Sequence, residues 1–342
     1  MTLRVSSHPL PSGEGRVRDS QATVLEGRPS PAAPAAASPE GRGEDALRVK
    51  TKPSLPPWFK VRPPSGDKLA WLKQQRQHHG LTTVCEEARC PNLAECWSQG
   101  TATFMVMGAL CSRACRFCHV ASGQPNGWLD ADEPQKLAQV VAEAGWHYVV
   151  ITSVDRDDLP DGGAAHIAAC ITAVRHAAPN CAVEVLIPDF AGDAEALATV
   201  LHAQPHVLAH NLETVARLSP TVRDRRAGYQ QSLTLLQRAK ASGLVQLTKS
   251  SLMLGLGETE AEVHQALADL RQHGVDVVTL GQYLQPSPKH LAVEAFIPPE
   301  QFATWQTLAT ETYGFVYCAS GPLVRSSYKA GEVAMRGLLH LG

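Results

Sequence analysis

Residues 85–118 read CEEARCPNLAECWSQGTATFMVMGALCSRACRFC, and they hold six of the nine cysteines of this 342-residue chain. The first three, Cys85, Cys90 and Cys96, have the spacing C-x4-C-x5-C. The other three, Cys111, Cys115 and Cys118, have the spacing C-x3-C-x2-C. Thiolates are soft ligands, and several of them on short loops favour zinc or an iron–sulfur cluster. The stretch therefore predicts a metal-binding function.

The second triplet favours a cluster over zinc. A structural zinc site needs four closed ligands, usually in two paired knuckles, and no second C-x2-C follows here. His119 adjoins Cys118 and could complete a zinc site, but so close a neighbour is poorly placed as a fourth ligand. On a [4Fe-4S] cube, three thiolates leave one iron open to a substrate or cofactor. We therefore favour iron–sulfur, and zinc and disulfides are the weaker alternatives.

The spacing C-x3-C-x2-C, with the aromatic Phe117 directly before the last cysteine, resembles the signature of the radical S-adenosylmethionine (SAM) superfamily. The resemblance implies that Cys111, Cys115 and Cys118 hold a [4Fe-4S] cluster whose open iron is chelated by SAM. The reduced cluster would cleave SAM to methionine and a 5'-deoxyadenosyl radical, which abstracts hydrogen from an unactivated carbon. The protein would place the cofactor and shield the radical.

Two further motifs are similar to those of the lipoyl synthase family: CEEARCPNLAECW at the first triplet and RSSYKAGE at residues 325–332. The resemblance implies a second, auxiliary [4Fe-4S] cluster held by Cys85, Cys90, Cys96 and a serine. We assign this fourth ligand to Ser327, with Ser326 as the alternative, and Cys318 would be the next candidate. A serine alkoxide is a harder and weaker partner for iron than a thiolate, which suits a cluster consumed as a sulfur source.

Other segments resemble the same family, and the resemblance covers roughly residues 53–335. They are TSVDRDDLPDGGA (152–164), HNLETV (210–215), KSSLMLGLGE (249–258) and LGQYLQPS (280–287). Ser251 replaces the usual glycine, and Ala216 and Asp224 stand where prolines are expected. The Ser251 departure puts the local backbone geometry in question rather than the chemistry.

The resemblance implies that two sulfur atoms are inserted at C6 and C8 of an octanoyl chain bound to a lysine of a lipoyl carrier domain. The carriers would be lipoyl domains of 2-oxoacid dehydrogenases or the glycine cleavage H protein. The electron donor would be a protein such as a flavodoxin or a ferredoxin. By position, Ser153, Asp155, Asn211 and Glu213 are candidate SAM contacts, although each could be a helix cap or turn residue. Arg325 could support the site or the carrier, or lie on the surface without a role. Alternatives are another sulfur-inserting radical SAM enzyme, such as one resembling biotin synthase, and a non-catalytic iron–sulfur or zinc protein.

The rest of the chain alternates short apolar runs with helical patterns, which predicts a parallel α/β sheet with right-handed crossovers. Expected strands are 103–108, 147–152, 182–187, 206–210, 245–254 and 275–281, and expected helices are 133–145, 163–177, 193–203, 229–242, 259–273 and 299–313. Six β–α units predict a partial TIM-like (β/α)6 barrel, with N-terminal and C-terminal extensions covering the barrel mouth. A doubly wound sheet is the alternative. Polar residues follow the strands, and this end of such barrels carries the active site.

Composition, the strand–helix pattern and the motifs similar to the lipoyl synthase family divide the chain into four parts. Residues 1–50 are rich in Pro, Ala, Gly and Ser, which predicts a disordered tail. Residues 51–102 are expected to form an extension carrying the auxiliary cysteines, residues 103–320 the barrel, and residues 321–342 the C-terminal segment with the RSSY motif. The acidic residues of the tail argue against an organelle transit peptide. A net charge of −2 suggests neither nucleic-acid nor membrane binding, and no apolar run approaches a membrane span. Clustered thiols indicate a reducing, cytoplasmic setting, and Cys170, Cys181 and Cys318 are expected in the core.

Overall fold

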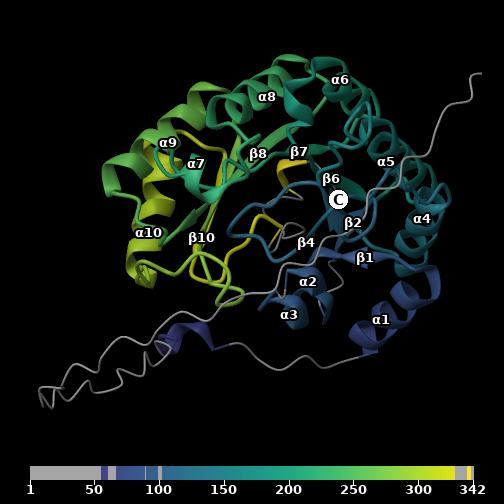
Figure 1. Cartoon of the computed structure of the whole chain (residues 1–342), viewed down its shortest axis with the longest axis horizontal. Helices are drawn as coiled ribbons and strands as arrows, with labels where there is room; N and C mark the ends of the chain where they lie inside the picture. The colour runs from purple at the N-terminus through teal and green to yellow at the C-terminus, as the bar shows by residue number, and fades with distance from the viewer. Residues whose placement is uncertain (1–54, 61–66, 89, 99–101, 328–336, 340–342) are drawn as a thin grey trace, which may run out of the picture. The chain divides into compact units, whose positions relative to one another are not determined.

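An eight-stranded sheet forms the centre of the computed structural model, which describes residues 55–60, 67–88, 90–98, 102–327 and 337–339. The strand order is β1-β2-β5-β6-β7-β8-β9-β10. The strands are β1 (Thr82–Thr83), β2 (Thr103–Val106), β5 (Tyr148–Ser153), β6 (Ala182–Leu186), β7 (Val207–Ala209), β8 (Leu247–Leu254), β9 (Val277–Gln282) and β10 (Tyr317–Gly321). From β2 to β10 neighbouring strands pair in parallel and in chain order, which excludes the doubly wound alternative. The predicted partial barrel is therefore confirmed, and Figure 1 shows it enclosed by an arc of helices.

All six predicted crossover helices are present: α4 (Glu133–Ala144), α5 (Ala164–Ala177), α6 (Ala194–His202), α8 (Tyr229–Ala241), α9 (Glu260–Gln272) and α10 (Pro299–Thr307). Local chemistry sets their ends. Asp193 accepts the N–H groups of Glu195 and Ala196 at the start of α6, and Thr259 forms a capping box with Glu262 at the start of α9. The bounds agree with the prediction to within about two residues, except that α10 continues as a π-helix over Leu308–Thr312.

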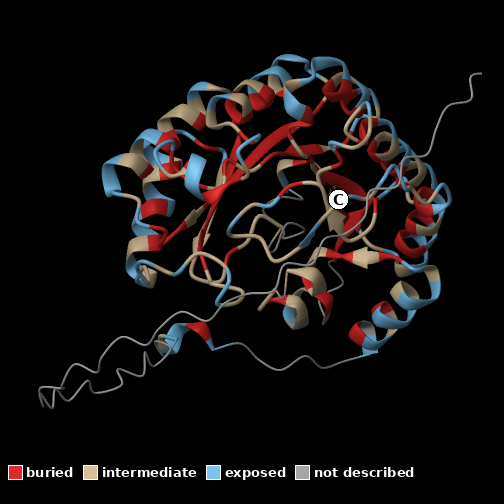
Figure 2. Cartoon of the chain, viewed as in Figure 1, coloured by how far each residue is buried: buried red, intermediate tan, exposed pale blue. Residues whose placement is uncertain are grey.

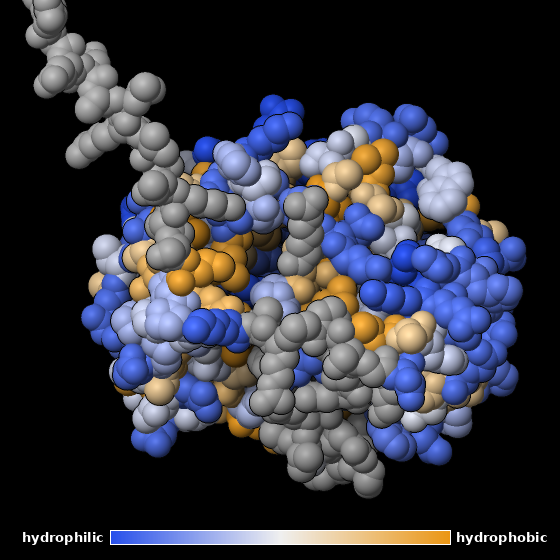
Figure 3. Space-filling view, turned by 90° about the horizontal axis from the view of Figure 1, so that it is seen from below, coloured by the Kyte–Doolittle hydropathy of each residue, from blue (hydrophilic) through white to orange (hydrophobic). Residues whose placement is uncertain are grey.

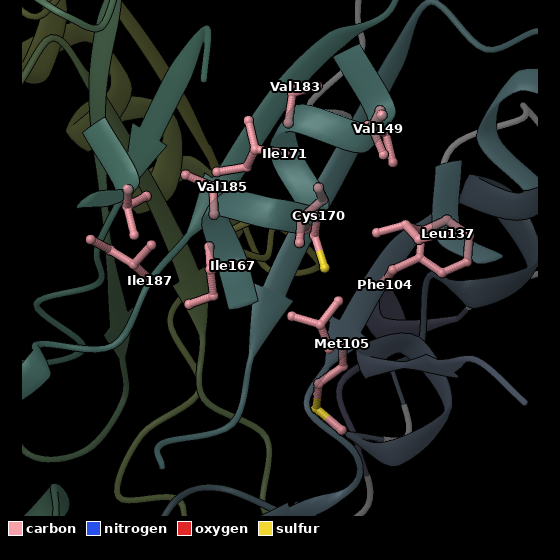
Figure 4. Close-up of a cluster of buried hydrophobic side chains, with 14 of the residues drawn as sticks. Phe104, Met105, Leu137, Val149, Ile167, Cys170, Ile171, Val183, Val185 and Ile187 are labelled. Carbon is pink, nitrogen blue, oxygen red and sulfur yellow. The ribbon is translucent and has the colours of Figure 1, made fainter. Parts of the chain in front are cut away.

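The main core lies between these helices and the outer face of the sheet. Figure 2 shows buried residues on the strands and on the inward helix faces, with exposed residues outside. Figure 4 shows Cys170 of α5 among Met105, Ile167 and Val185. Cys170, Cys181 and Cys318 are all buried, as expected for core thiols.

A smaller cluster forms where the parallel strands begin, from Tyr148, Val150, Ala182, Val207, Leu247, Val277 and Leu339. Beside it, the Lys249 ammonium lies 2.9 Å from the Glu184 carboxylate, which also accepts the Tyr148 hydroxyl at 2.7 Å. All three side chains are buried, so this end of the barrel is filled rather than open. Leu339 belongs to the C-terminal segment, so the last described residues of this segment pack at the end of the barrel where the strands begin.

The N-terminal extension packs against the edge of the sheet next to β2. Strand β1 pairs with β2 in antiparallel fashion, and α1 (Asp67–His79) precedes it. Leu69 and Leu72 of α1 are buried in the same core cluster as Trp97. The short helices α2 (Val84–Glu87) and α3 (Leu93–Ser98) carry the first cysteine triplet. The predicted tail, residues 1–50, lies outside the described residues.

Hydrophilic side chains cover most of the face seen in Figure 3, and apolar ones lie in small groups. Among the described helices, we find none that combines the length and the apolar character needed to cross a membrane.

Candidate functional site

The second cysteine triplet follows β2. Cys111 ends the short strand β3 (Leu110–Cys111), and Cys115 and Cys118 lie in the loop between β3 and β4 (Ala121–Ser122). Met107 and Gly108, the first residues after β2, both have left-handed φ angles, of 69° and 82°. The Met107 N–H donates to the Glu133 carboxylate at 2.9 Å, and the same oxygen contacts Nε2 of His166 at 2.7 Å. This clamp holds a backbone conformation that is uncommon for methionine. The chain thereby turns away from the strand direction directly before Cys111.

Backbone and carboxylate groups surround the three thiols. Sγ of Cys111 lies 3.8 Å from Oδ2 of Asp155 and accepts the Arg113 N–H at 3.4 Å, and Sγ of Cys115 accepts the Asp224 N–H at 3.2 Å. Burial raises the pKa of Cys111 and of Cys115 to about 12 and that of Cys118 to about 11. A metal centre of positive charge is what would favour thiolates here, because coordination deprotonates a thiol outright.

Arg113 anchors this loop to the ends of two strands. Its guanidinium lies 2.7 Å from Asp189, 2.8 Å from Asp157 and 3.3 Å from Asp155. The ion pairs and hydrogen bonds with Arg113 outweigh burial and hold the pKa values of Asp157 and Asp189 below their usual range. At Asp155 burial prevails and raises the pKa to about 6. The three carboxylates follow β5 and β6, so the arginine fixes the loop to the C-terminal end of the sheet.

A second anchor comes from the loop after β9. Nε2 of His290 donates to the Cys118 carbonyl at 2.9 Å, while Ser287 Oγ contacts Nδ1 of the same ring at 2.8 Å. Nδ1 of His119 lies 2.8 Å from the Glu87 carbonyl, so it must carry the proton. The His119 ring stacks on His290 with centroids 5.7 Å apart. His119 thus joins the two cysteine loops.

The four predicted SAM contacts lie at the ends of β5 and β7. Asp155 touches Cys111, and Glu213 lies near enough to raise the pKa of Cys115 and Cys118. Glu213 has a left-handed φ of 69°, and burial raises its pKa although Asn211 bonds to it. Ser153 Oγ is buried and has no hydrogen-bond partner among the described residues. A buried hydroxyl without a partner is costly, so a polar ligand such as SAM would fit here.

The first cysteine triplet is held on the two short helices of the extension. Cys85 lies in α2 and Cys96 in α3, and the Cys90 N–H donates to the Cys85 carbonyl at 2.9 Å. Burial raises the pKa of Cys85 and Cys90. The Trp97 indole N–H is buried without a hydrogen-bond partner among the described residues, yet it lies near enough to Cys85 to lower the pKa of that thiol. Cluster thiolates or sulfides would satisfy this donor, so the auxiliary site also fits an iron–sulfur group.

The C-terminal segment meets this triplet from the other end of the sequence. The Asn92 amide donates to the Leu323 carbonyl at 2.5 Å. Arg325 lies near Cys90. Burial raises the pKa of the Cys90 thiol, while the backbone N–H of Asn92 and, less strongly, the charge of Arg325 lower it. Arg325 therefore lies beside the first cysteine triplet and is half-buried. Ser327 follows two residues later and is half-buried.

Several site residues were not singled out by sequence reasoning. The hydrogen-bond partners of three of them lie far away in the sequence: these are Arg113, Asn92 and His290. The only sequence signal for Asp157 and Asp189 was the density of polar residues after the strands. Asp224 stands where a proline was expected. Its N–H bonds to Cys115 and its carboxylate accepts the Ala114 N–H at 2.9 Å; a proline lacks both groups. Ser251 lies within the regular strand β8, so the missing glycine leaves the backbone undisturbed.

Two protein families match the sequence. The radical SAM superfamily matches residues 105–270, and the N-terminal domain of lipoyl synthase of the radical SAM family matches residues 27–90. The second match begins inside the stretch predicted as a disordered tail.

Curated relatives extend this similarity over most of the chain. A lipoyl synthase of Myxococcus xanthus is 58% identical over 83% of this chain and 95% of its own length. A lipoyl synthase of Thermus thermophilus is 54% identical over 81% of this chain and 86% of its own. Among solved structures, the FeFe-hydrogenase maturase HydG from Carboxydothermus hydrogenoformans has a TM-score of 0.53 at 12% identity, covering 73% of this chain and 64% of that one. The structural likeness concerns the fold alone.

Proposed function

The chain belongs to the lipoyl synthase family of radical SAM enzymes, and from this membership we propose how its own residues divide the work of sulfur insertion. Its function is that of a radical SAM lipoyl synthase, which inserts two sulfur atoms at C6 and C8 of a protein-bound octanoyl chain. We assign the SAM cluster to Cys111, Cys115 and Cys118. We assign the auxiliary cluster, the sulfur donor, to Cys85, Cys90, Cys96 and Ser327.

One observation carries this division. The two triplets lie on loops joined directly by the His119–Glu87 hydrogen bond of 2.8 Å, at the end of the barrel where the strands finish. Such closeness suits a reaction in which a carbon activated at one centre must receive sulfur at the other. A structural metal protein would have no need to bring two open sites together.

When bound, the SAM cluster supplies the electron that splits SAM, and the auxiliary cluster supplies sulfur. The residues of the chain orient and enclose these groups. Ser153 and Asn211 offer polar atoms to SAM, Asp155 and Glu213 balance the charge beside the cysteines, and Arg113 keeps the cysteine loop on β5 and β6. Buried side chains fill the far end of the barrel and keep water from the radical.

The substrate is an octanoylated lipoyl domain. We propose that the carriers are lipoyl domains of 2-oxoacid dehydrogenases or the glycine cleavage H protein, with a flavodoxin or ferredoxin as electron donor. We also propose that residues 51–102 and 321–342 act as the auxiliary part and residues 103–320 as the radical SAM part. The Asn92–Leu323 hydrogen bond supports this grouping, because it joins the two extensions to each other.

Anaerobic reconstitution followed by mass spectrometry of an octanoylated carrier peptide tests the function. The peptide should gain two sulfurs, with no net change in hydrogen for the dithiol formed under reducing conditions and a loss of two hydrogens once it is oxidised to the disulfide, and the protein should hold about eight irons per chain. The Cys115→Ala variant is the matched control and should give no product. Binding of one zinc and no iron, or a parent protein that cleaves SAM without adding sulfur, would overturn the proposal.

A further inference from the structure

We propose that Asn92 is a positioning residue of the auxiliary site: its side-chain amide holds the segment Leu323–Arg325 against the first cysteine loop and so keeps Ser327 within reach of the auxiliary cluster. The inference rests on the proposed function, since it takes Ser327 as a ligand of that cluster. It adds a residue that lies between two cysteines and binds no metal itself.

Asn92 contacts both sides of this junction. Its backbone carbonyl accepts the Cys96 N–H at 2.9 Å, and its backbone N–H bonds toward the Cys90 thiol and lowers the pKa of that group against the larger effect of burial. Its Nδ2 atom donates to the Leu323 carbonyl at 2.5 Å, across 231 positions of sequence. One side chain, only 2% exposed, therefore ties the cysteine loop to the C-terminal segment.

A second contact fixes the same segment from the barrel side. The Val324 carbonyl rests against Gly281 near the end of β9, where an added Cβ would lie 2.1 Å from that oxygen. Nη1 of Arg325 donates to the same carbonyl at 2.7 Å, and the guanidinium lies near Cys90. Two residues of extended chain span at most about 7 Å, so fixing Arg325 limits where Ser327 can go.

The energetics of Asn92 separate positioning from plain stability. Its Oδ1 atom is buried and has no hydrogen-bond partner among the described residues. A buried acceptor left unpaired costs about 1–3 kcal/mol. Leucine has a similar size, so Asn92→Leu removes this unpaired acceptor but also leaves the Leu323 carbonyl without its donor, and the two effects should leave the global stability about unchanged. If Asn92 served stability alone, this substitution would have little effect. If Asn92 positions the segment, the substitution should loosen residues 321–327 although the global stability is kept.

The test compares reconstituted parent, Asn92→Leu and Asn92→Ala in two measurements besides activity. One is hydrogen exchange of the amides in residues 321–327. The other is the rate at which a ferrous chelator removes iron from the auxiliary cluster, measured in the Cys115→Ala background so that this cluster alone is followed. Losing one hydrogen bond should raise the iron-release rate roughly three- to tenfold and speed up the exchange. Asn180→Ala, in an exposed turn, is the control and should change neither.

A double-mutant cycle with Ser327→Ala decides whether Asn92 acts through the serine. If it does, Ser327→Ala should raise the release rate by a similar factor, and the double variant should release iron no faster than Ser327→Ala alone. Parent-like exchange and release in both Asn92 variants would overturn the inference, as would effects that simply add to those of Ser327→Ala. Failure of the parent to convert octanoyl peptide would count against the proposed function. Hydrogen exchange and the iron-release rate would still test the role of Asn92, because neither depends on turnover.

Discussion

Nδ1 of His119 donates to the Glu87 carbonyl over 2.8 Å, and this hydrogen bond ties the loop carrying Cys118 to the end of helix α2, which carries Cys85. The His119 ring stacks on the ring of His290, with ring centroids 5.7 Å apart. His290 in turn donates to the Cys118 carbonyl at 2.9 Å. The relative placement of the two cysteine loops therefore depends on a pair of histidines, neither of which we assign as a metal ligand.

Replacing His119 with alanine should separate SAM cleavage from sulfur insertion. Both sets of cysteines remain, so both clusters should assemble, but the loops lose their direct link and the activated carbon should meet the auxiliary cluster less often. The measurement is the ratio of 5'-deoxyadenosine formed to lipoyl product, which should rise several-fold, on the scale of losing about one hydrogen bond. His176→Ala, on the exposed side of α5, should keep the parent ratio. An unchanged ratio in His119→Ala would show that the bond has no role in coupling.

The buried Arg113 network predicts a large loss of stability in Arg113→Ala. The guanidinium is almost fully buried and faces Asp155, Asp157 and Asp189. Its removal leaves the buried Asp189 carboxylate without this cation, while Asp157 keeps Arg226 at 3.1 Å. Breaking one side of a buried ion pair typically costs about 3–5 kcal/mol. Urea unfolding of the apoprotein measures the change. Arg217→Ala breaks a pair with Glu262 in which the arginine is mostly exposed, so this control should cost under about 1 kcal/mol. Equal losses in the two variants would contradict the assigned role of Arg113.

How much of the molecule the sequence could predict depends on how local each pattern is. Strands such as 182–186 and helices such as 260–272 were found because their apolar periodicity and caps lie within a dozen residues. The cysteines were found because their spacing is short. Arg113 and Asp189 are 76 positions apart, and Asn92 and Leu323 are 231 apart. Which polar residues meet across such distances follows from the barrel closing, and no local pattern records it.

The C-terminal segment shows the same limit more sharply. Its motif pointed to the mouth, and Leu323 does contact Asn92 there. Leu339 packs instead among Tyr148 and Val207, near the starts of the strands. An apolar residue near the end of a chain fits any open part of a core equally well, so periodicity alone gives no reason to choose one end of the barrel. The cysteines Cys170 and Cys318, in contrast, were predicted correctly because they sit within apolar runs of their own elements.

His210 predicts a loss of stability in mild acid. Nδ1 contacts the Ile187 carbonyl at 2.9 Å and Nε2 contacts Ser232 Oγ at 2.8 Å, while Arg223 donates to the same hydroxyl. Burial and the charge of Arg223 lower the pKa of His210 to about 4. In the unfolded chain the pKa is near 6.5, so the unfolded state binds the proton first as the pH falls. The associated stability is complete above pH 6.5 and is lost between pH 6.5 and 4, by about 3 kcal/mol.

Urea unfolding of the apoprotein at pH 7 and pH 4.5 measures this effect against His210→Gln, which has no group titrating in this range. Both proteins should lose stability in acid, because carboxylates such as Asp189 have lowered pKa values. The parent should lose about 2–3 kcal/mol more than the variant over this interval. Identical pH slopes for the two proteins would mean that His210 is free to take up a proton in the folded state.

Cys115→Ala should abolish SAM cleavage and leave the auxiliary cluster in place. Two thiolates hold a cubane poorly, while Cys85 in α2, Cys90 in the loop after it and Cys96 in α3 belong to a part of the chain that the substitution does not touch. The iron content should fall from about eight to about four per chain. Cys170→Ala removes a thiol from the core instead and should keep the full iron content. Production of 5'-deoxyadenosine by Cys115→Ala at the parent rate would refute the assignment of this triplet.

The final prediction concerns Ser327, the oxygen ligand proposed for a site with three thiolates. Cys318 is buried at 1% exposure in the core cluster that includes Phe302 and Trp305 of α10, which favours Ser327 over it as the fourth ligand. Ser327 follows a segment fixed beside Cys90 and is half-buried. Ser327→Ala should therefore bind close to the parent amount of iron and cleave SAM, yet fail to insert both sulfurs.

Ser327→Cys separates a ligand from a mere neighbour of the cluster. A thiolate is softer than an alkoxide and holds iron more firmly, so this variant should release iron to a chelator more slowly than the parent and also fail to form lipoyl product. A residue that only packed beside the site would give no such slowing, since its sulfur would not reach the iron. The measurements are chelator kinetics and mass spectrometry of the octanoyl peptide, with Ser326→Ala as the matched control expected to retain activity. Loss of product in Ser326→Ala alone would transfer the role to Ser326, and full activity in all three variants would show that no serine of this segment is a ligand.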